Sequence, residues 1–309
     1  MRTFIGRWTA LFLAVLALFL PALLPALGAS PVQKTAVPYM LRASSPLPSW
    51  LTRVNAYRAQ AGLPPVEYDL MWSRDAWYHA RYMVKEDQVG HSEDPSSPWY
   101  TPQGNRAAGV SNVFVSTQVN TRDVHAIDWW MTAPFHAAAI LEPRVTKMGF
   151  GSYREPVGMW RYGAVLDVLD GVDYHRLEGF PVRWPGPHVT VSLHRFAGGE
   201  FPDPLAACPG YHPPTGLPIL FLLRPNVVPA VGRYAVETQG AKLDTCLITP
   251  TTYQHPDPRT RDLVRTIMRY HGMIILIPRS PLRARATYTV SLEVNGTHYR
   301  WTFRVADQG

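Results

Sequence analysis

The side chains in this sequence that could carry out catalysis do not form any self-contained catalytic motif. The chain has no His-Glu-x-x-His helix, no Gly-x-Ser-x-Gly turn and no glycine-rich phosphate loop. The segment Gly149-Phe150-Gly151-Ser152 is similar to the Gly-x-Ser-x-Gly turn, but it lies in a run of residues that predicts a buried strand. Any catalytic or binding site must therefore be formed by side chains that the fold brings together from separate helices, strands and loops.

Helical patterns fill the first half of the chain. Apolar side chains repeat at helical spacing over residues 49–62, where Ser49 can cap the start and Gly62 ends the helix. The same reasoning predicts further helices at 69–87, 122–131 and 134–141, a polar loop at 93–104, and strands at 146–153 and 157–169. His91 directly follows the second of these helices. An α+β domain of about 130 residues is the expected result.

Five ordered motifs in this half resemble the CAP superfamily (cysteine-rich secretory proteins, antigen 5 and pathogenesis-related proteins, also called SCP domains). They are NAYRAQAGLPPVEYD, AWYHARYM, GHSEDP, WMTAPFHAAAILEPR and KMGFGSY, and they lie within residues 49–170. The similarity is closest to the bacterial secreted branch. It implies an α/β/α sandwich with a central antiparallel sheet and a cleft that holds two histidines and two glutamates.

The resemblance assigns four positions of this chain to that cleft. His91 of GHSEDP and His136 of APFH match the two family histidines. The first glutamate position is taken by Ser111, and the second, three residues after Trp130, is taken by Ala133. Both carboxylates are therefore missing, so the cleft is expected to be degenerate.

A divalent metal such as zinc at His91 and His136 is an open expectation. Two neutral imidazoles suit zinc, copper or nickel, but closed structural zinc sites have four ligands. Acid–base catalysis would also lose its usual carboxylates. Four residues are available to compensate only if the fold brings them into the cleft: Glu93, Asp94, His125 and Asp128. No cofactor is certain from the sequence.

Aromatic side chains near the expected cleft suggest a further property. Trp99 and Tyr100 lie in the polar, proline-rich loop, and with His125 they are predicted to form the rim of an apolar groove. The resemblance includes relatives that bind sterols or lipids, and such a groove would provide the binding route.

The second half, residues 181–309, has the patterns of strands. Two strictly alternating runs flank Asn295-Gly296, the favoured pair of a tight hairpin turn, and so predict a hairpin with one buried face. More short strands are predicted at 188–196, 218–223, 233–237, 243–249 and 273–278. They favour an all-β sandwich that resembles bacterial Ig-like domains, with the domain boundary near residue 180 and the CAP-like domain at 49–180.

The N-terminal segment predicts export. Residues 1–30 have a basic start, a short apolar run and small residues after it, which is the layout of a cleaved signal peptide, and the alternative is a single-pass membrane anchor. Residues 31–48 are a proline-rich linker. Outside the cytoplasm a disulfide can form, and Cys208 and Cys246 are the only two cysteines of the chain. Their pairing is expected, with two separate buried thiols as the alternative.

The charge distribution argues against nucleic-acid binding. The chain has a formal net charge of +7, but residues 45–180 hold 12 Lys and Arg against 15 Asp and Glu. The basic excess lies in residues 181–309 as scattered arginines, densest at residues 259–269, without the aromatic-rich basic run of a nucleic-acid module.

The sequence is compatible with three functions from different classes. The preferred one is a secreted binding or interaction protein whose partner is an extracellular lipid, peptide or cell-wall component. The others are a metal-dependent hydrolase that acts on peptide or cell-wall material, and a lipid- or sterol-binding protein. A membrane is a partner only if the N-terminal segment is not cleaved.

Overall fold

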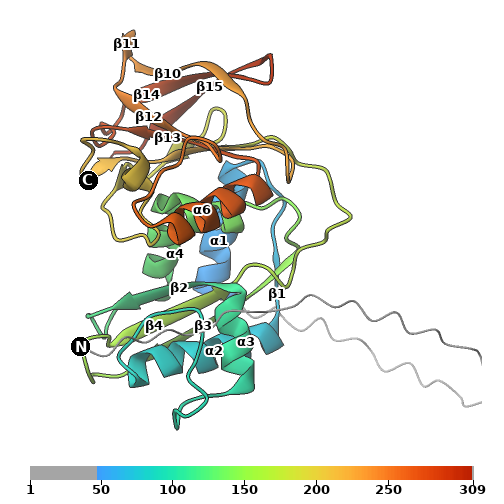
Figure 1. The fold of residues 1–309 in the computed structure, drawn as a ribbon, viewed down its shortest axis with the longest axis vertical. Coiled ribbons are helices and arrows are strands. Elements are labelled where there is room, and N and C mark those ends of the chain that lie inside the picture. The colour runs from blue at the N-terminus through green and yellow to red at the C-terminus, as the bar shows by residue number, and fades with distance from the viewer. Residues whose placement is uncertain (1–46, 308–309) are drawn as a thin grey trace, which may run out of the picture. The chain divides into compact units, whose positions relative to one another are not determined.

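A four-stranded sheet with helices on both faces forms the first half of the described chain (Figure 1). The computed structural model describes residues 47–307, so the expected signal segment and almost all of the linker lie outside the described residues. The strand order is β1-β3-β4-β2, with β1 parallel to β3 and the other pairs antiparallel. The strands are β1 (Glu67–Tyr68), β2 (Ser111–Ser116), β3 (Lys147–Arg154) and β4 (Tyr162–Asp167). The helices are α1 (Ser49–Gln60), α2 (Leu70–Lys85), α3 (Pro102–Gly109), α4 (Asp123–Thr132) and α5 (Pro134–Ile140).

Alternation along β3 explains the two layers of helices. Gly149 and Gly151 face α2 so closely that an added Cβ would collide with the helix backbone. Phe150, on the opposite face, stacks on Trp50 of α1 at 5.4 Å between ring centroids and meets Trp130 of α4 edge-on. The glycines of β3 thus allow α2 to pack closely on one face of the sheet. On the other face the aromatic cluster packs α1 and α4 against the sheet. This confirms the expected α/β/α arrangement.

The second half is rich in strands. A five-stranded sheet has the order β11-β10-β14-β15-β6, and a four-stranded sheet has the order β12-β13-β9-β5. The strands are β5 (Val182–Trp184), β6 (Thr190–Val191), β7 (Arg195–Phe196), β8 (Thr215–Gly216), β9 (Ile219–Leu222), β10 (Val231–Thr238), β11 (Ala241–Lys242), β12 (Thr245–Ile248), β13 (Met273–Pro278), β14 (Thr287–Val294) and β15 (Thr297–Val305). The predicted hairpin is β14–β15, and both Asn295 and Gly296 have the positive φ that its turn requires. Cys208 and Cys246 form the expected disulfide.

Helix α6 (Pro258–Tyr270) was not predicted and departs from an all-β second half. Asp257 caps it by accepting hydrogen bonds from the backbone N–H groups of Arg259 and Thr260. Val264 and Met268, one turn apart, are fully buried. A cap, a proline at the first helical position and this spacing are the helix signal, although most of the remaining residues are polar.

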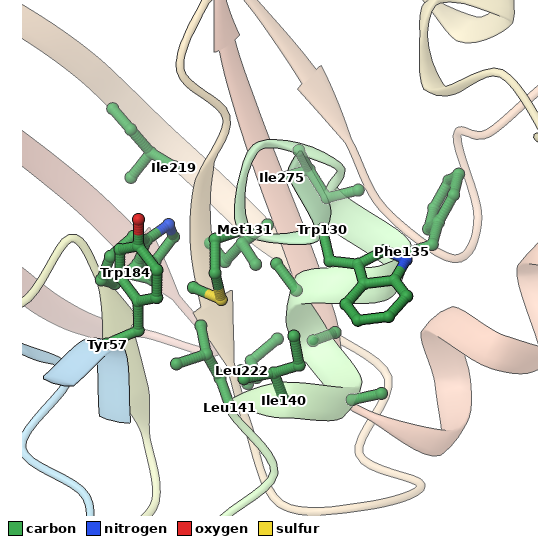
Figure 2. Close-up of a cluster of buried hydrophobic side chains, with 14 of the residues drawn as sticks. Tyr57, Trp130, Met131, Phe135, Ile140, Leu141, Trp184, Ile219, Leu222 and Ile275 are labelled. Carbon is green, nitrogen blue, oxygen red and sulfur yellow. The ribbon is translucent and has the colours of Figure 1, made fainter. Parts of the chain in front are cut away.

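The hydrophobic core continues across residue 180, as Figure 2 shows. The ring of Tyr57 in α1 lies 5.5 Å from that of Trp184 in β5 and nearly perpendicular to it. Ile140 and Leu141, at the end of α5, belong to the same buried cluster as Leu222 of β9. The chain from residue 46 onward accordingly forms one compact unit. The boundary expected near residue 180 lies within this core, and the division into a CAP-like domain at 49–180 and an Ig-like domain at 181–309 stays a prediction.

Candidate functional site

A cavity of about 670 Å³ lies where the two halves of the chain meet. The first half contributes residues around the start of β2, the α5 helix and the loop after β4. The second half contributes Phe201, Pro202 and one side of α6 with His271. Most of the lining is apolar, and none of the described lining residues is Asp, Glu, Lys or Arg. Neither half of the chain builds this cavity without the other.

Three of the four predicted cleft positions line this cavity. These are His91, Ser111 and His136. The Nδ1 atom of His91 donates a hydrogen bond to the carbonyl oxygen of Ala108 at 2.9 Å. Desolvation by the surrounding protein lowers the pKa of His91, and the neighbouring imidazole of His136 lowers it further. His91 is therefore neutral at pH 7.

The fourth predicted position, Ala133, does not reach the cavity. It is fully buried between α4 and α5 and forms the N-terminal cap position of α5, where its side chain offers no acceptor. Glu200, from the second half, supplies the missing acceptor. Its Oε1 atom accepts hydrogen bonds from the backbone N–H groups of Phe135 at 2.9 Å and His136 at 3.1 Å. A carboxylate at this helix end also meets the positive end of the peptide dipoles.

The same carboxylate oxygen orients the imidazole of His136. The Nδ1 atom of His136 donates to Oε1 of Glu200 at 2.7 Å. Burial raises the pKa of Glu200, while the hydrogen bonds from His136 oppose this rise. Glu200 was missed at the sequence level because it lies 64 residues from His136 and no local motif marks it. The site thus has a carboxylate beside its second histidine, although not from the family position.

A third histidine, also missed, lines the cavity from the end of α6. The Nδ1 atom of His271 donates to Oε2 of Glu142 at 3.2 Å, and Arg144 donates to both oxygens of that carboxylate at 2.7 and 3.1 Å. Burial alone would raise the pKa of Glu142, but the hydrogen bonds from His271 and Arg144 outweigh it and lower the pKa to about 2. The hydrogen bond from His271 to Glu142 ties the segment after α5 to the end of α6.

Ser111 and Asn112 contribute polar side chains at the start of β2. Asn112 donates its side-chain N–H to the carbonyl oxygen of His136 at 3.1 Å. The hydroxyl of Ser111 is buried and has no hydrogen-bond partner among the described residues. Ser111 is not hydrogen-bonded to either histidine, so the arrangement is not a serine–histidine catalytic pair.

The residues expected to rim a groove lie elsewhere. Trp99 packs under the cationic side chains of Lys85 and Arg81 on α2, at 4.7 and 5.5 Å from its ring centroid. His125 on α4 packs edge-on against Phe114. Neither these two nor Tyr100 lines the cavity. The loop before α3 turns toward the exposed side of α2, and the apolar wall comes from α6 instead.

The carboxylates that were candidates to compensate for the missing pair have other roles. Glu93 is buried and accepts hydrogen bonds from Nδ1 of His79 at 3.0 Å and from the backbone of Thr101 at 2.9 Å. Asp128 accepts from the hydroxyl of Tyr57 and pairs with Arg53. Over residues 47–307 no group of three or more His, Cys, Asp or Glu is placed to hold a metal ion. His91 and His136 thus lack the further protein ligands of a structural zinc site.

Comparisons with known proteins found a matching family model and several similar solved structures. Residues 51–160 match the family model described as CAP, cysteine-rich secretory protein family. An extracellular protein containing a SCP domain from Bacillus anthracis str. Ames is 18% identical, with a TM-score of 0.31, and the match covers 39% of each chain. An outer surface protein from Borrelia burgdorferi is 15% identical, with a TM-score of 0.29, over 38% of this chain and 86% of that one.

The similarity to these solved structures covers only part of the chain. The chain spans less than half the length of the first of these structures. No curated protein matches the sequence. Among residues 47–307 no helix is long and apolar enough to cross a membrane.

Proposed function

Residues 51–160 form a CAP domain, and from this premise we propose that the protein is a secreted binding protein that takes a neutral, largely apolar small molecule. The observation that carries the proposal is the cavity between the CAP domain and α6. Its volume of about 670 Å³ is typical of small-molecule sites, and its walls are mostly apolar. Because no Asp, Glu, Lys or Arg lines it, a charged ligand would lose its hydration without gaining a counter-ion.

The position of the cavity supports ligand entry from solvent. Phe201 and Leu263, which belong to its lining, are 77% and 54% exposed. A single exposed apolar side chain is normal on a protein surface. Exposed apolar side chains that gather beside an apolar cavity are, in contrast, a common feature of binding sites. Thr266 is also exposed, on the same side of α6 as Leu263.

The hydrolase alternative has less support. Neither Glu200 nor Glu142 lines the cavity, so no carboxylate of the described lining is placed to act on a bound substrate as a general acid or base. A metal-dependent reaction would have to proceed with only two protein ligands, His91 and His136. Secretion is supported by the signal-type segment at residues 1–30 and by the disulfide, which is typical of oxidising compartments.

The proposal is tested with a neutral fluorescent dye, Nile red, and two tryptophan variants on α6. Thr266→Trp fills the cavity from an exposed position, so dye binding should be lost. Arg269→Trp is the matched control, because Arg269 is exposed on the same helix and does not line the cavity. Equal dye binding by both variants would contradict the proposal. Turnover of casein or peptidoglycan that disappears in His136→Ala would favour the hydrolase instead.

A further inference from the structure

A buried carboxyl group lies behind the wall of the cavity, at the end of β4. Asp167 is only 1% exposed, and its Oδ1 atom accepts hydrogen bonds from the backbone N–H groups of Leu169 and Asp170 at 3.3 and 3.1 Å. Its Oδ2 atom is also buried and receives no hydrogen bond from any residue of the described chain. An ionised carboxylate with an unpaired oxygen is costly in such a position, because it has lost its water.

The charged groups around Asp167 do not balance its charge. Asp170, on the same turn, brings a second carboxyl group close to it. Arg106 of α3 donates hydrogen bonds to Asp170 and, at 3.0 Å, to Asp75 of α2. Asp75 also pairs with Arg74 at 3.1 Å. Three carboxyl groups thus share two guanidinium groups, and the cluster becomes neutral when one carboxyl group holds a proton.

The strands beside β4 bring no further counter-ion to Asp167. In the register of the sheet it lies between Ser111 of β2 and Gly149 of β3, and β2 has no charged residue. Arg106, the one charged residue of α3, is therefore the cation that acts on Asp167, although it already binds two other carboxylates. The remaining charged side chains of α2 and β3 have contacts of their own: His79 with Glu93, Arg81 with Trp77, Lys85 with Glu155, Lys147 with Glu67, and Arg154 with Asp123.

A proton on Asp167 removes this imbalance. It cancels the buried charge and makes the carboxyl group a hydrogen-bond donor, which can donate to the carboxylate of Asp170. Burial and the nearby carboxylate of Asp170 raise the pKa of Asp167 to about 7. Asp167 therefore holds a proton in mildly acidic solution and is mostly ionised above neutral pH.

We propose that Asp167 is a pH-dependent switch in the wall of the cavity: its protonated form holds the turn of residues 167–170 closed, and its ionised form lets this turn open. The turn contributes Val168 and Leu169 to the lining, and the N–H group of Val168 donates to the carbonyl oxygen of Val110 at 3.2 Å. Ionisation places two carboxylates against each other within the turn, so local opening, which returns Asp167 to water, becomes more frequent. This switch does not depend on the identity of a ligand.

The direction of the pH effect follows from the pKa of Asp167 in the two forms of the turn. In the open turn the carboxyl group is in water and has its ordinary pKa of 3.8, whereas in the closed turn the pKa is about 7. A raised pKa favours the closed turn most strongly below pH 3.8, and this preference is lost as the pH rises to about 7. The open fraction should therefore rise about tenfold between pH 6 and pH 8.

Native-state hydrogen exchange, followed by mass spectrometry of fragments that cover residues 167–172, tests the switch without a ligand. After correction for the intrinsic pH dependence of exchange, the protection of these amides in the wild type should fall about tenfold from pH 6 to pH 8. In Asp167→Asn the side-chain oxygen still accepts from the backbone N–H groups, but the amide cannot ionise. Protection in this variant should therefore be the same at both pH values.

Asp262→Asn is the matched control, because it removes an exposed carboxylate of α6 that does not line the cavity, and it should keep the tenfold change. Asp170→Asn removes the neighbouring carboxylate, so the pKa of Asp167 should fall and the change between pH 6 and pH 8 should shrink. Equal protection of the wild type at both pH values would overturn the proposal. A tenfold change that persists in Asp167→Asn, or remains whole in Asp170→Asn, would overturn it as well.

Discussion

The buried carboxylate of Glu142 provides the sharpest test of how the two halves of the chain are joined. Its oxygens accept hydrogen bonds from Arg144 in the CAP half and from His271 at the end of α6. Replacing it in Glu142→Gln keeps the size of the side chain but removes the charge. The guanidinium of Arg144, whose side chain is only 5% exposed, then stays without its counter-ion. We expect a large loss of stability, because a buried charge without its partner is costly.

The magnitude follows from the pKa of Glu142. Hydrogen bonds from His271 and Arg144 overcome the effect of burial and lower it from 4.5 to about 2. A shift of this size corresponds to about 3 kcal/mol of folding free energy. Because the folded-state pKa is lowered, this stabilisation is present above the unfolded-state pKa. It is lost as the pH falls from about 4.5 through about 2.

Urea unfolding, followed by tryptophan fluorescence at several pH values, measures the effect. At pH 7 the free energy of unfolding of Glu142→Gln should be about 3 kcal/mol lower than that of the wild type, and the gap should narrow in acid. Glu67→Gln, at an exposed carboxylate of β1, is the control and should change stability by about 0.5 kcal/mol or less. A gap that does not depend on pH, or an equal loss in the control, would refute the reasoning.

Three further predictions concern the core, the sheet and the cavity. Trp184→Ala removes a fully buried ring that packs on Tyr57 and should cost about 3–5 kcal/mol in urea unfolding; a loss below about 1 kcal/mol would mean that the two halves are not packed as described. Gly151→Ala places a methyl group against the backbone of α2 and should lower the free energy of unfolding by at least about 1–3 kcal/mol. In the control Gly109→Ala the added methyl group meets nothing within 4 Å, so the free energy of unfolding should not fall. Similar melting temperatures for the two variants would contradict the close approach of α2 to β3. Desolvation lowers the pKa of His91, so in titration calorimetry Nile red affinity should stay constant from pH 8 to 7 and weaken only in more acidic solution, where protonation places a charge in the apolar wall of the cavity; tighter binding in acid would be the opposite result.

Much of the first half was predictable because its signals are local. The side chain of Asp69 caps α2 as an N-terminal acceptor should, and the apolar repeat of residues 49–62 matches α1. Helix α4 begins one residue later than expected, and no side chain caps it. Helix α3 and strand β2 were missed, since residues 102–116 contain small and polar residues without a clear period.

The sequence by itself determined the CAP fold, the pair His91 and His136, the hairpin turn at residues 295–296 and the only possible disulfide. Each of these depends on residue identity or on spacing within a short segment. Only the tertiary structure decided the chemistry of the site. Glu200 reaches His136 from 64 residues further along the chain, and His271, which lines the cavity, reaches Glu142 from 129 residues further along. Packing of α6 against the CAP half then encloses the cavity, and no local pattern records that contact because its free energy comes from surfaces far apart in the chain.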